Sequence, residues 1–174
     1  ASQLAAPVDQ TTDQFEVAVS YVTAKLQATL AYQYSQFKNG FDSLSWDNPF
    51  NPVVAGADRG QMALAPDNTF QQIVGSIGYQ IMPTLRASAD AAFGRGTQNA
   101  DYLASTVNPN LAPAVPPLPS QSLDGQVDTY NGNVKLTYTP LENLRLNAIY
   151  AWDVRDNDTA VQSYPIVSTS IFIN

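Results

Sequence analysis

The stretch that decides the fold is residues 126–157, QVDTYNGNVKLTYTPLENLRLNAIYAWDVRDN. In its second half, from Leu144 to Val154, every other residue is apolar or aromatic, and the residues between them are mostly polar or charged. Ile149 is the one large apolar exception. Its first half alternates in the same way before the turn. Because successive side chains of a strand point to opposite faces, the stretch predicts two strands with one apolar and one polar face.

The length of these strands distinguishes two classes of β-protein. A soluble β-sandwich also alternates, but its strands typically have about 5–6 residues, roughly half the length indicated here. Strands of about 10 residues with apolar side chains outward, polar side chains inward and aromatic residues at the edges are typical of a membrane-spanning barrel. The predicted fold class is therefore all-β, an antiparallel up-and-down transmembrane β-barrel.

Two earlier parts of the chain repeat this design around turns near Thr23 and Pro83. Three hairpins are expected, at about residues 14–37, 69–94 and 126–157. The long connections, rich in glycine and proline, lie at about residues 39–68, 97–124 and 157–165. Outer-membrane barrels have short periplasmic turns and longer extracellular loops, so the three turns are expected on the periplasmic side. Tyr164–Asn174 can begin another strand, which the pattern does not place.

These hairpins make residues 1–174 part of a single transmembrane barrel domain. About six strands are expected, whereas the smallest transmembrane barrels have 8. Open strand edges in lipid would leave backbone N–H and C=O groups unpaired, at several kcal/mol each. The remaining strands are therefore expected from chain outside this segment. Ala1–Gln10 lacks the basic start and apolar core of a signal peptide, so we expect a fragment or a processed product of an exported protein.

Composition narrows the function classes. Charged residues make up 13% of the chain and hydrophobic residues 44%, against about 25% charged residues in a typical soluble domain. A helical membrane protein is not expected, because no run of about 18 apolar residues occurs, and a net charge of −7 argues against a nucleic-acid partner. The sequence has no cysteine and no histidine, which removes disulfides, the usual zinc sites, covalent haem attachment and Ser-His-Asp catalysis. We therefore expect no catalytic, metal-binding or cofactor-binding residues and no enzymatic activity.

Four runs of the sequence resemble the MtrB/PioB family of decahaem-associated outer-membrane barrels. They are SLDGQVDTYNGNVKLTYTPLENLRLNAIYAWDVRDNDT (residues 122–159), GQMALAPDNTFQQIVGSIGY (60–79), FGRGTQNADYL (93–103) and LSWDNPF (44–50). The motifs are specific in combination and weak singly, and the similarity covers most of the chain. A Cys-x-x-Cys near the N-terminus of some members is absent here. Its absence fits a segment from the middle or C-terminal part of such a barrel and leaves the branch of the family open.

The resemblance implies a sheath in the bacterial outer membrane. In that family, the barrel holds a periplasmic-side decahaem c-type cytochrome in its lumen, and electrons pass to an extracellular multihaem cytochrome or to a mineral or metal acceptor. About 30 Å of hydrocarbon is too thick for a single electron hop, and a water-soluble cytochrome cannot face lipid. The haem c is carried by the partner, so this chain is expected to bind no cofactor. Outward reduction and inward oxidation use similar barrels.

Polar positions of the predicted strands are candidates for contact with such a cytochrome. The lumen-facing candidates are Arg86, Asp90, Lys135, Arg145, Asn147, Asp153 and Arg155. The alternative for each of them is a solvated lumen wall with cross-strand ion pairs, each worth about 0–1 kcal/mol. Asp156 and Asp158 are interpreted as a polar loop rim rather than a Ca²⁺ site, because they lack the spacing of a calcium loop.

Aromatic residues near the strand ends are expected to form an interfacial girdle rather than a redox relay. The predicted girdle consists of Tyr21, Tyr32, Tyr34, Tyr79, Phe93, Tyr138, Tyr150 and Trp152.

Two other function classes stay open at this point. A diffusion porin or substrate channel of the outer membrane would show the same alternation around a water-filled lumen, and only the family-like runs separate it from a sheath. A soluble β-domain for adhesion or binding would need no detergent, but the strand length and the aromatic edges argue against it.

Overall fold

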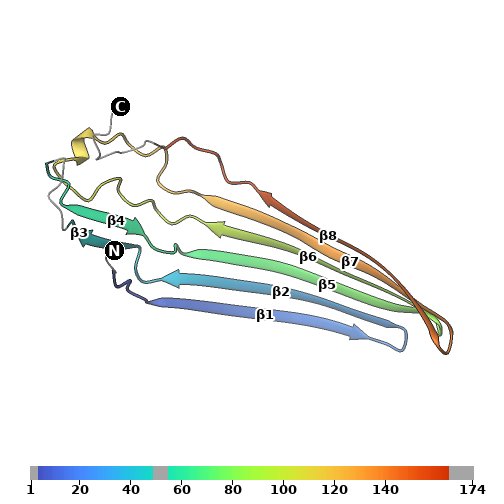
Figure 1. Ribbon diagram of the computed structural model, residues 1–174. Coiled ribbons are helices and arrows are strands. Elements are labelled where there is room, and N and C mark those ends of the chain that lie inside the picture. Colours follow the sequence, from blue (N-terminus) through green and yellow to red (C-terminus); the bar gives the residue numbers. More distant parts are fainter. Residues whose placement is uncertain (1–3, 49–54, 165–174) are drawn as a thin grey trace.

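The computed structural model describes residues 4–48 and 55–164 (Figure 1). Its main element is an antiparallel sheet of six long strands, in which strands that follow one another in the chain lie next to one another in the sheet. This confirms the expected all-β antiparallel fold of six strands. The strands are β1 (Gln10–Val22), β2 (Leu26–Asn39), β5 (Asn68–Met82), β6 (Leu85–Gln98), β7 (Gly125–Leu141) and β8 (Leu144–Asn157).

The strands extend beyond the ranges that the alternation indicated. β1 begins at Gln10 rather than at about residue 14, and β6 continues to Gln98 rather than ending at about residue 94. The extensions are polar, and Thr11 and Thr12 still pair with β2 across their backbones. Backbone pairing does not depend on an apolar side chain, so the apolar alternation underestimates where a strand ends.

The two ends of the sheet differ in their connections (Figure 1). We call the end with the three short turns the turn end and the opposite end, which carries the long connections, the loop end. In the first turn, the Thr23 backbone N–H donates to the Leu26 carbonyl at 2.7 Å, and the Leu26 N–H donates to the Thr23 hydroxyl at 2.9 Å. In the second turn, the Gln80 amide donates to the Met82 carbonyl at 2.6 Å. These contacts keep both turns short.

A second, small sheet lies in the connection between β2 and β5, where only a long loop was expected. It pairs β3 (Ser43–Asp47) with β4 (Arg59–Ala63). Trp46 lies directly over Gly60, where any larger residue would collide with the indole ring. The later connection contains a short 3₁₀ helix, η1 (Ala112–Ala114). Phe50, in the first of these loops, lies outside the described residues.

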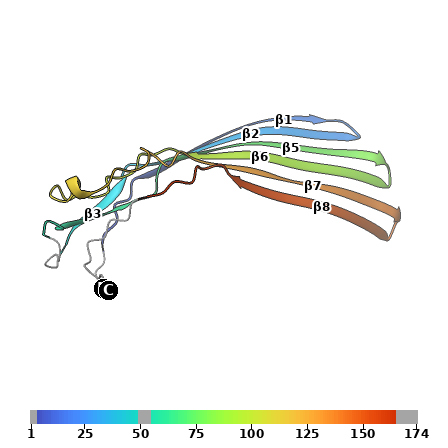
Figure 2. The ribbon, with the colours of Figure 1, turned by 90° about the horizontal axis from the view of Figure 1, so that it is seen from above.

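Over the described residues, the main sheet is a single layer, with no second layer on either face (Figure 2). Among the described residues, no hydrophobic side chain is buried, and even Ile73 and Ile77 of the inner strand β5 are each 49% exposed. A soluble domain buries the apolar face of its sheet against another layer, so the described part of the chain does not fit the soluble alternative. No helix in residues 4–48 or 55–164 is long and apolar enough to cross a membrane. The strand considered beyond Tyr164 falls in residues 165–174, outside the described residues.

Candidate functional site

The strand register sorts the side chains of the sheet onto two faces. Residues directly opposite one another in antiparallel strands point to the same side. One register row that crosses all six strands consists of Val17, Tyr32, Ile73, Phe93, Tyr130 and Val154. The neighbouring rows on this side are also largely apolar, and we call it the apolar face. The alternation read in separate hairpins is therefore continuous over the whole sheet.

The opposite side, which we call the polar face, carries all seven of the predicted lumen residues. A row on this face consists of Ser20, Thr29, Ser76, Asp90, Asn133 and Ala151. Arg86 aligns with Thr137 and through it with Asn147, and Lys135 aligns with Ile149. The remaining members follow from alternation along β8: Arg145, Asp153 and Arg155. Their common face is a structural finding, and their contact with a cytochrome stays a prediction.

The polar face is smooth over the middle strands and rougher over the last two. In the centre of β2, β5 and β6 its side chains are mostly small: Thr29, Ala31, Ser76, Ser88 and Ala92. On β7 and β8 they are longer and more polar: Asn131, Asn133, Lys135, Asn147, Asp153 and Arg155. A body that approaches this face can therefore come closest to the backbone over β2, β5 and β6.

Among the described residues, the charged side chains of the polar face do not form ion pairs. In residues 4–48 and 55–164, the ion pairs are Arg59–Asp47 at 3.6 Å and Arg95–Asp128 at 2.7 Å, and neither lies on this face. Cross-strand ion pairs were the alternative role for the polar-face charges, and the described residues do not form them there. The hydrogen bonds on this face include Gln33 to Glu16 at 2.8 Å and Ser20 with Thr29 at 3.0 Å.

The Arg86 side chain lies along the polar face rather than projecting from it. Its Nη2 donates to the Gln27 side-chain oxygen at 2.9 Å, so the side chain extends from β6 across β5 to β2. Gly78 of β5 leaves the space for this path, since a Cβ there would lie 2.9 Å from Nη2. This contact joins the first two hairpins across the face near the turn end. The other arginines of the set have no such hydrogen bond among those found in the described residues.

All eight aromatic residues predicted for the girdle lie on the apolar face. Tyr150 and Trp152 of β8 stack at a centroid distance of 5.9 Å, and Phe93 packs against Tyr130 at 5.0 Å. The sequence prediction left out Tyr130 and also Phe15, although both have the same alternation as the residues included. Whether these residues lie at a lipid–water boundary stays a prediction.

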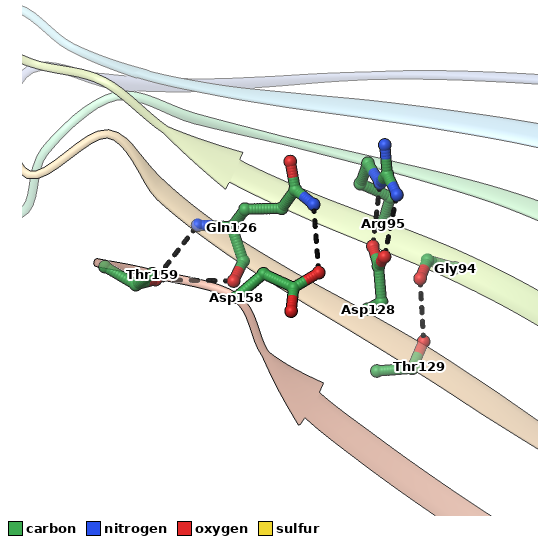
Figure 3. Close-up of polar contacts among 7 residues, drawn as sticks. All are labelled: Gly94, Arg95, Gln126, Asp128, Thr129, Asp158 and Thr159. Carbon is green, nitrogen blue, oxygen red and sulfur yellow. Dashed lines mark hydrogen bonds and ion pairs between the residues drawn. The ribbon is translucent and has the colours of Figure 1, made fainter. Parts of the chain in front are cut away.

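The prediction from sequence missed the Arg95–Asp128 ion pair, shown in Figure 3. Arg95 donates from Nε and Nη2 to the two Asp128 carboxylate oxygens, each at 2.7 Å. The pair belongs to the apolar face and lies in the first row beyond Phe93 and Tyr130 toward the loop end. The Asp128 side chain is only 5% exposed, whereas that of Arg95 is 48% exposed. Bidentate, charge-assisted hydrogen bonds of this kind are among the stronger polar contacts in proteins.

The long connections fold together at the loop end. The Asn108 amide forms two hydrogen bonds with the backbone of Arg59, one as acceptor and one as donor, each at 2.9 Å. These bonds tie the second long connection to β4 of the first. The hydroxyls of Tyr102 and Tyr164 are hydrogen-bonded to each other, and desolvation followed by this bond raises the pKa of Tyr102. The loop end is therefore an ordered structure over the described residues.

A cavity of about 790 Å³ opens between these connections and the ends of the central strands. Phe70 and Leu123 contribute apolar surface, and Asp101 and Arg155 contribute charge. Phe70 is an aromatic residue on the polar face, where its ring packs over Gly94. The described residues contain no group of three or more acidic, histidine or cysteine side chains that could hold a metal ion.

Comparisons with known proteins agree with this geometry and confirm the resemblance of the sequence runs. A family model described as outer membrane beta-barrel porin, MtrB/PioB, matches residues 1–172. Outer membrane protein MtrB of Shewanella baltica (strain OS185) is 31% identical over 165 residues, which cover 95% of this chain and 23% of that relative. The chain thus spans less than a quarter of the relative's length. Its six strands are a segment of a larger barrel.

Proposed function

Because the chain belongs to the MtrB/PioB family of outer-membrane β-barrels, we propose that it is part of a sheath that holds a multihaem c-type cytochrome for electron transfer across the membrane. In this proposal the polar face lines the lumen and the apolar face contacts lipid. The loop end is extracellular and the turn end periplasmic, as the loop lengths of such barrels indicate. The family is one of barrels rather than enzymes.

The observation that carries the proposal is the smooth wall over β2, β5 and β6. A rigid protein that fills a lumen needs a wall that it can approach closely, and small side chains such as those of alanine and serine provide one. A water-filled channel has no such requirement, because water follows any surface. Ala31, Ser76 and Ala92 lie near the middle of this wall, where longer side chains would hold a partner away from the backbone.

In residues 4–48 and 55–164, the charged groups beside the smooth wall form no ion pairs, so their charges can contact a partner. Asp90 is exposed and lies between Ser76 and Asn133 in its row. The next two strands of the sheet, β7 and β8, carry Lys135, Asp153 and Arg155. Charges of both signs on a water-filled wall cost little while no partner is present, and they set the orientation of a partner with complementary charges.

The chemistry of the chain fits a scaffold. With no cysteine and no histidine in 174 residues, the segment can supply neither a thioether link nor an axial histidine, so the proposed cytochrome carries the haem c. The barrel contributes solvation, because a soluble cytochrome cannot face about 30 Å of hydrocarbon. At the loop end, the ordered connections form the surface on which an extracellular multihaem cytochrome would receive or deliver electrons.

The test compares two tryptophan substitutions on β6 in the full-length barrel, purified from native outer membranes in detergent. Ala92→Trp places a bulky ring on the smooth wall, whereas Ala89→Trp places one on the apolar face. We expect Ala92→Trp to lower the ratio of haem to barrel severalfold, while Ala89→Trp retains the wild-type ratio. Both barrels should be recovered in similar amounts.

Two results would contradict the proposal. Equal haem ratios in the two variants would mean that no body lies close to the wall. A wild-type barrel without haem that conducts ions in a planar bilayer would favour the open porin. An affinity tag for this purification belongs between Pro116 and Pro117, because both residues are exposed.

A further inference from the structure

Most aromatic residues on the apolar face fall on two lines that cross the strands obliquely, and Tyr32 and Tyr150 lie two residues inside one of them. The line near the turn end runs through Tyr21 on β1, Tyr79 on β5 and Tyr138 on β7. In the register, Tyr21 aligns with Val134 on β7, so Tyr138 lies four residues closer to the turn end after four strand steps. The line therefore shifts by one residue for each strand.

The second line, near the loop end, has the same slope. It runs through Phe15 on β1, Tyr34 on β2, Phe93 on β6, Tyr130 on β7 and Trp152 on β8. Phe15 aligns with Asp156 on β8, so Trp152 lies four residues closer to the turn end after five steps. Both lines shift in the same direction by nearly the same amount, although different residues of different strands define them.

The first polar residues beyond the second line shift in this direction as well. On β1 the first polar residue is Asp13, which aligns with Gln126 on β7. On β7 the first polar residue is Asp128, which lies two residues closer to the turn end and is held by Arg95. The first polar residues of β5 to β8, Gln71, Arg95, Asp128 and Asp156, lie in one register row. The boundary between apolar and polar side chains therefore shifts in the direction of the aromatic lines, but by two residues over the whole sheet.

We propose that the two lines mark the edges of the lipid hydrocarbon on this face, so that the membrane crosses the sheet obliquely. A shift of one residue, about 3.4 Å, for each strand step of about 4.8 Å corresponds to a strand tilt of roughly 35°. Transmembrane barrels have tilts of about 35–45°. Along β7, the eight residue steps from Tyr130 to Tyr138 then span a band about 22 Å tall, close to the ~25 Å expected.

This inference rests on the proposed assignment of the apolar face to lipid, and it adds the depth of each residue. Val19 and Trp152 lie in one register row, yet they are placed at different depths. Val19 lies four residues inside the second line on β1, and Ala148 lies four residues inside it on β8. Val19 and Ala148 therefore share a depth, although they lie in different rows.

The test attaches a nitroxide spin label to single cysteines at Val19, Ala148 and Trp152 of the full-length barrel in phosphatidylcholine vesicles. Power saturation with oxygen and with a water-soluble nickel chelate measures the depth of each label. Ala151, on the polar face of β8, is the water-exposed reference. We expect equal depths at Val19 and Ala148, and a label at Trp152 about 11 Å closer to the loop-end surface, from four residues of tilted strand.

The possible failures are distinguishable. Equal depths at Val19 and Trp152 would mean that the strands stand upright, which overturns the inference. High nickel accessibility at both Val19 and Ala148 would mean that the apolar face borders water, which overturns the face assignment as well. A barrel without a cytochrome leaves all three depths unchanged, because sheath and porin share the same lipid surface.

Discussion

An arginine placed on the apolar face should destabilise the barrel far more than an arginine on the adjacent polar-face residue. Val134 on β7 is 45% exposed on the apolar face. It lies four residues from Tyr130 and four from Tyr138, about 13 Å of strand from each aromatic line. This places Val134 at the middle of the proposed band. Asn133, its neighbour in the chain, points to the opposite face.

The expected magnitude follows from that depth. An arginine on the lipid face at the bilayer midplane costs about 2–4 kcal/mol, which is roughly a 30- to 700-fold change in the unfolding equilibrium. Asn133→Arg should change the free energy of unfolding by no more than about 1 kcal/mol, because its row partner Asp90 offers an exposed carboxylate. Leu146→Arg, which aligns with Tyr138 near the first line, should cost about 1 kcal/mol or less.

The assay is urea unfolding of the full-length barrel in phosphatidylcholine vesicles, with the heat-dependent shift of the folded band on gels as a second measure. The expected order of destabilisation is Val134→Arg, then Leu146→Arg, then Asn133→Arg. Equal losses for Val134→Arg and Asn133→Arg would refute the division of the sheet into two faces. Equal losses for Val134→Arg and Leu146→Arg would refute the depth that the aromatic lines assign to Leu146.

Three further substitutions test separate contacts. Arg95→Gln should lower resistance to urea, since it leaves the Asp128 carboxylate without its guanidinium, and adding Asp128→Asn should restore part of the loss; a double variant no better than the single one would contradict this. Asn108→Ala should cost about 1–3 kcal/mol locally and speed hydrogen exchange at the Arg59 amide, while strand amides stay protected; unchanged exchange at Arg59 would rule out the coupling of the two loops. Gly132→Ala should displace the Trp152 ring and change its fluorescence, whereas Gly75→Ala in the same row has free space; identical spectra for the two variants would show that the ring does not cover Gly132.

Alternation along the chain was sufficient to predict the sheet. In each long strand the apolar face can be read from residues two apart, as from Leu144 to Val154 on β8. The register then joins these strand faces into a continuous surface, which confirms the antiparallel up-and-down order. Such a pattern is strong because lipid imposes the same requirement on every strand. The same reasoning placed all seven polar candidates on one face.

Contacts between distant residues could not be read in this way. Arg95 and Asp128 are 33 positions apart, and only the pairing of β6 with β7 brings them together. The β3–β4 hairpin was missed because its strands have five residues each and a long connection separates them. No sequence pattern marks Asn108 as important. Its side-chain amide bonds to the N–H and C=O of Arg59 as a neighbouring strand would, and only the structure shows this contact. Phe70 interrupts the polar alternation, and only the structure shows its ring over Gly94.

The proposed sheath is tested most directly by the visible absorbance of the wild-type, full-length barrel. The protein would be extracted from native outer membranes in mild detergent, captured by a tag between Pro116 and Pro117, and washed with high salt. We predict a c-type haem spectrum that survives the wash at a fixed ratio of haem to barrel. A folded, colourless barrel that is heat-modifiable on gels would contradict the sheath and support the porin alternative.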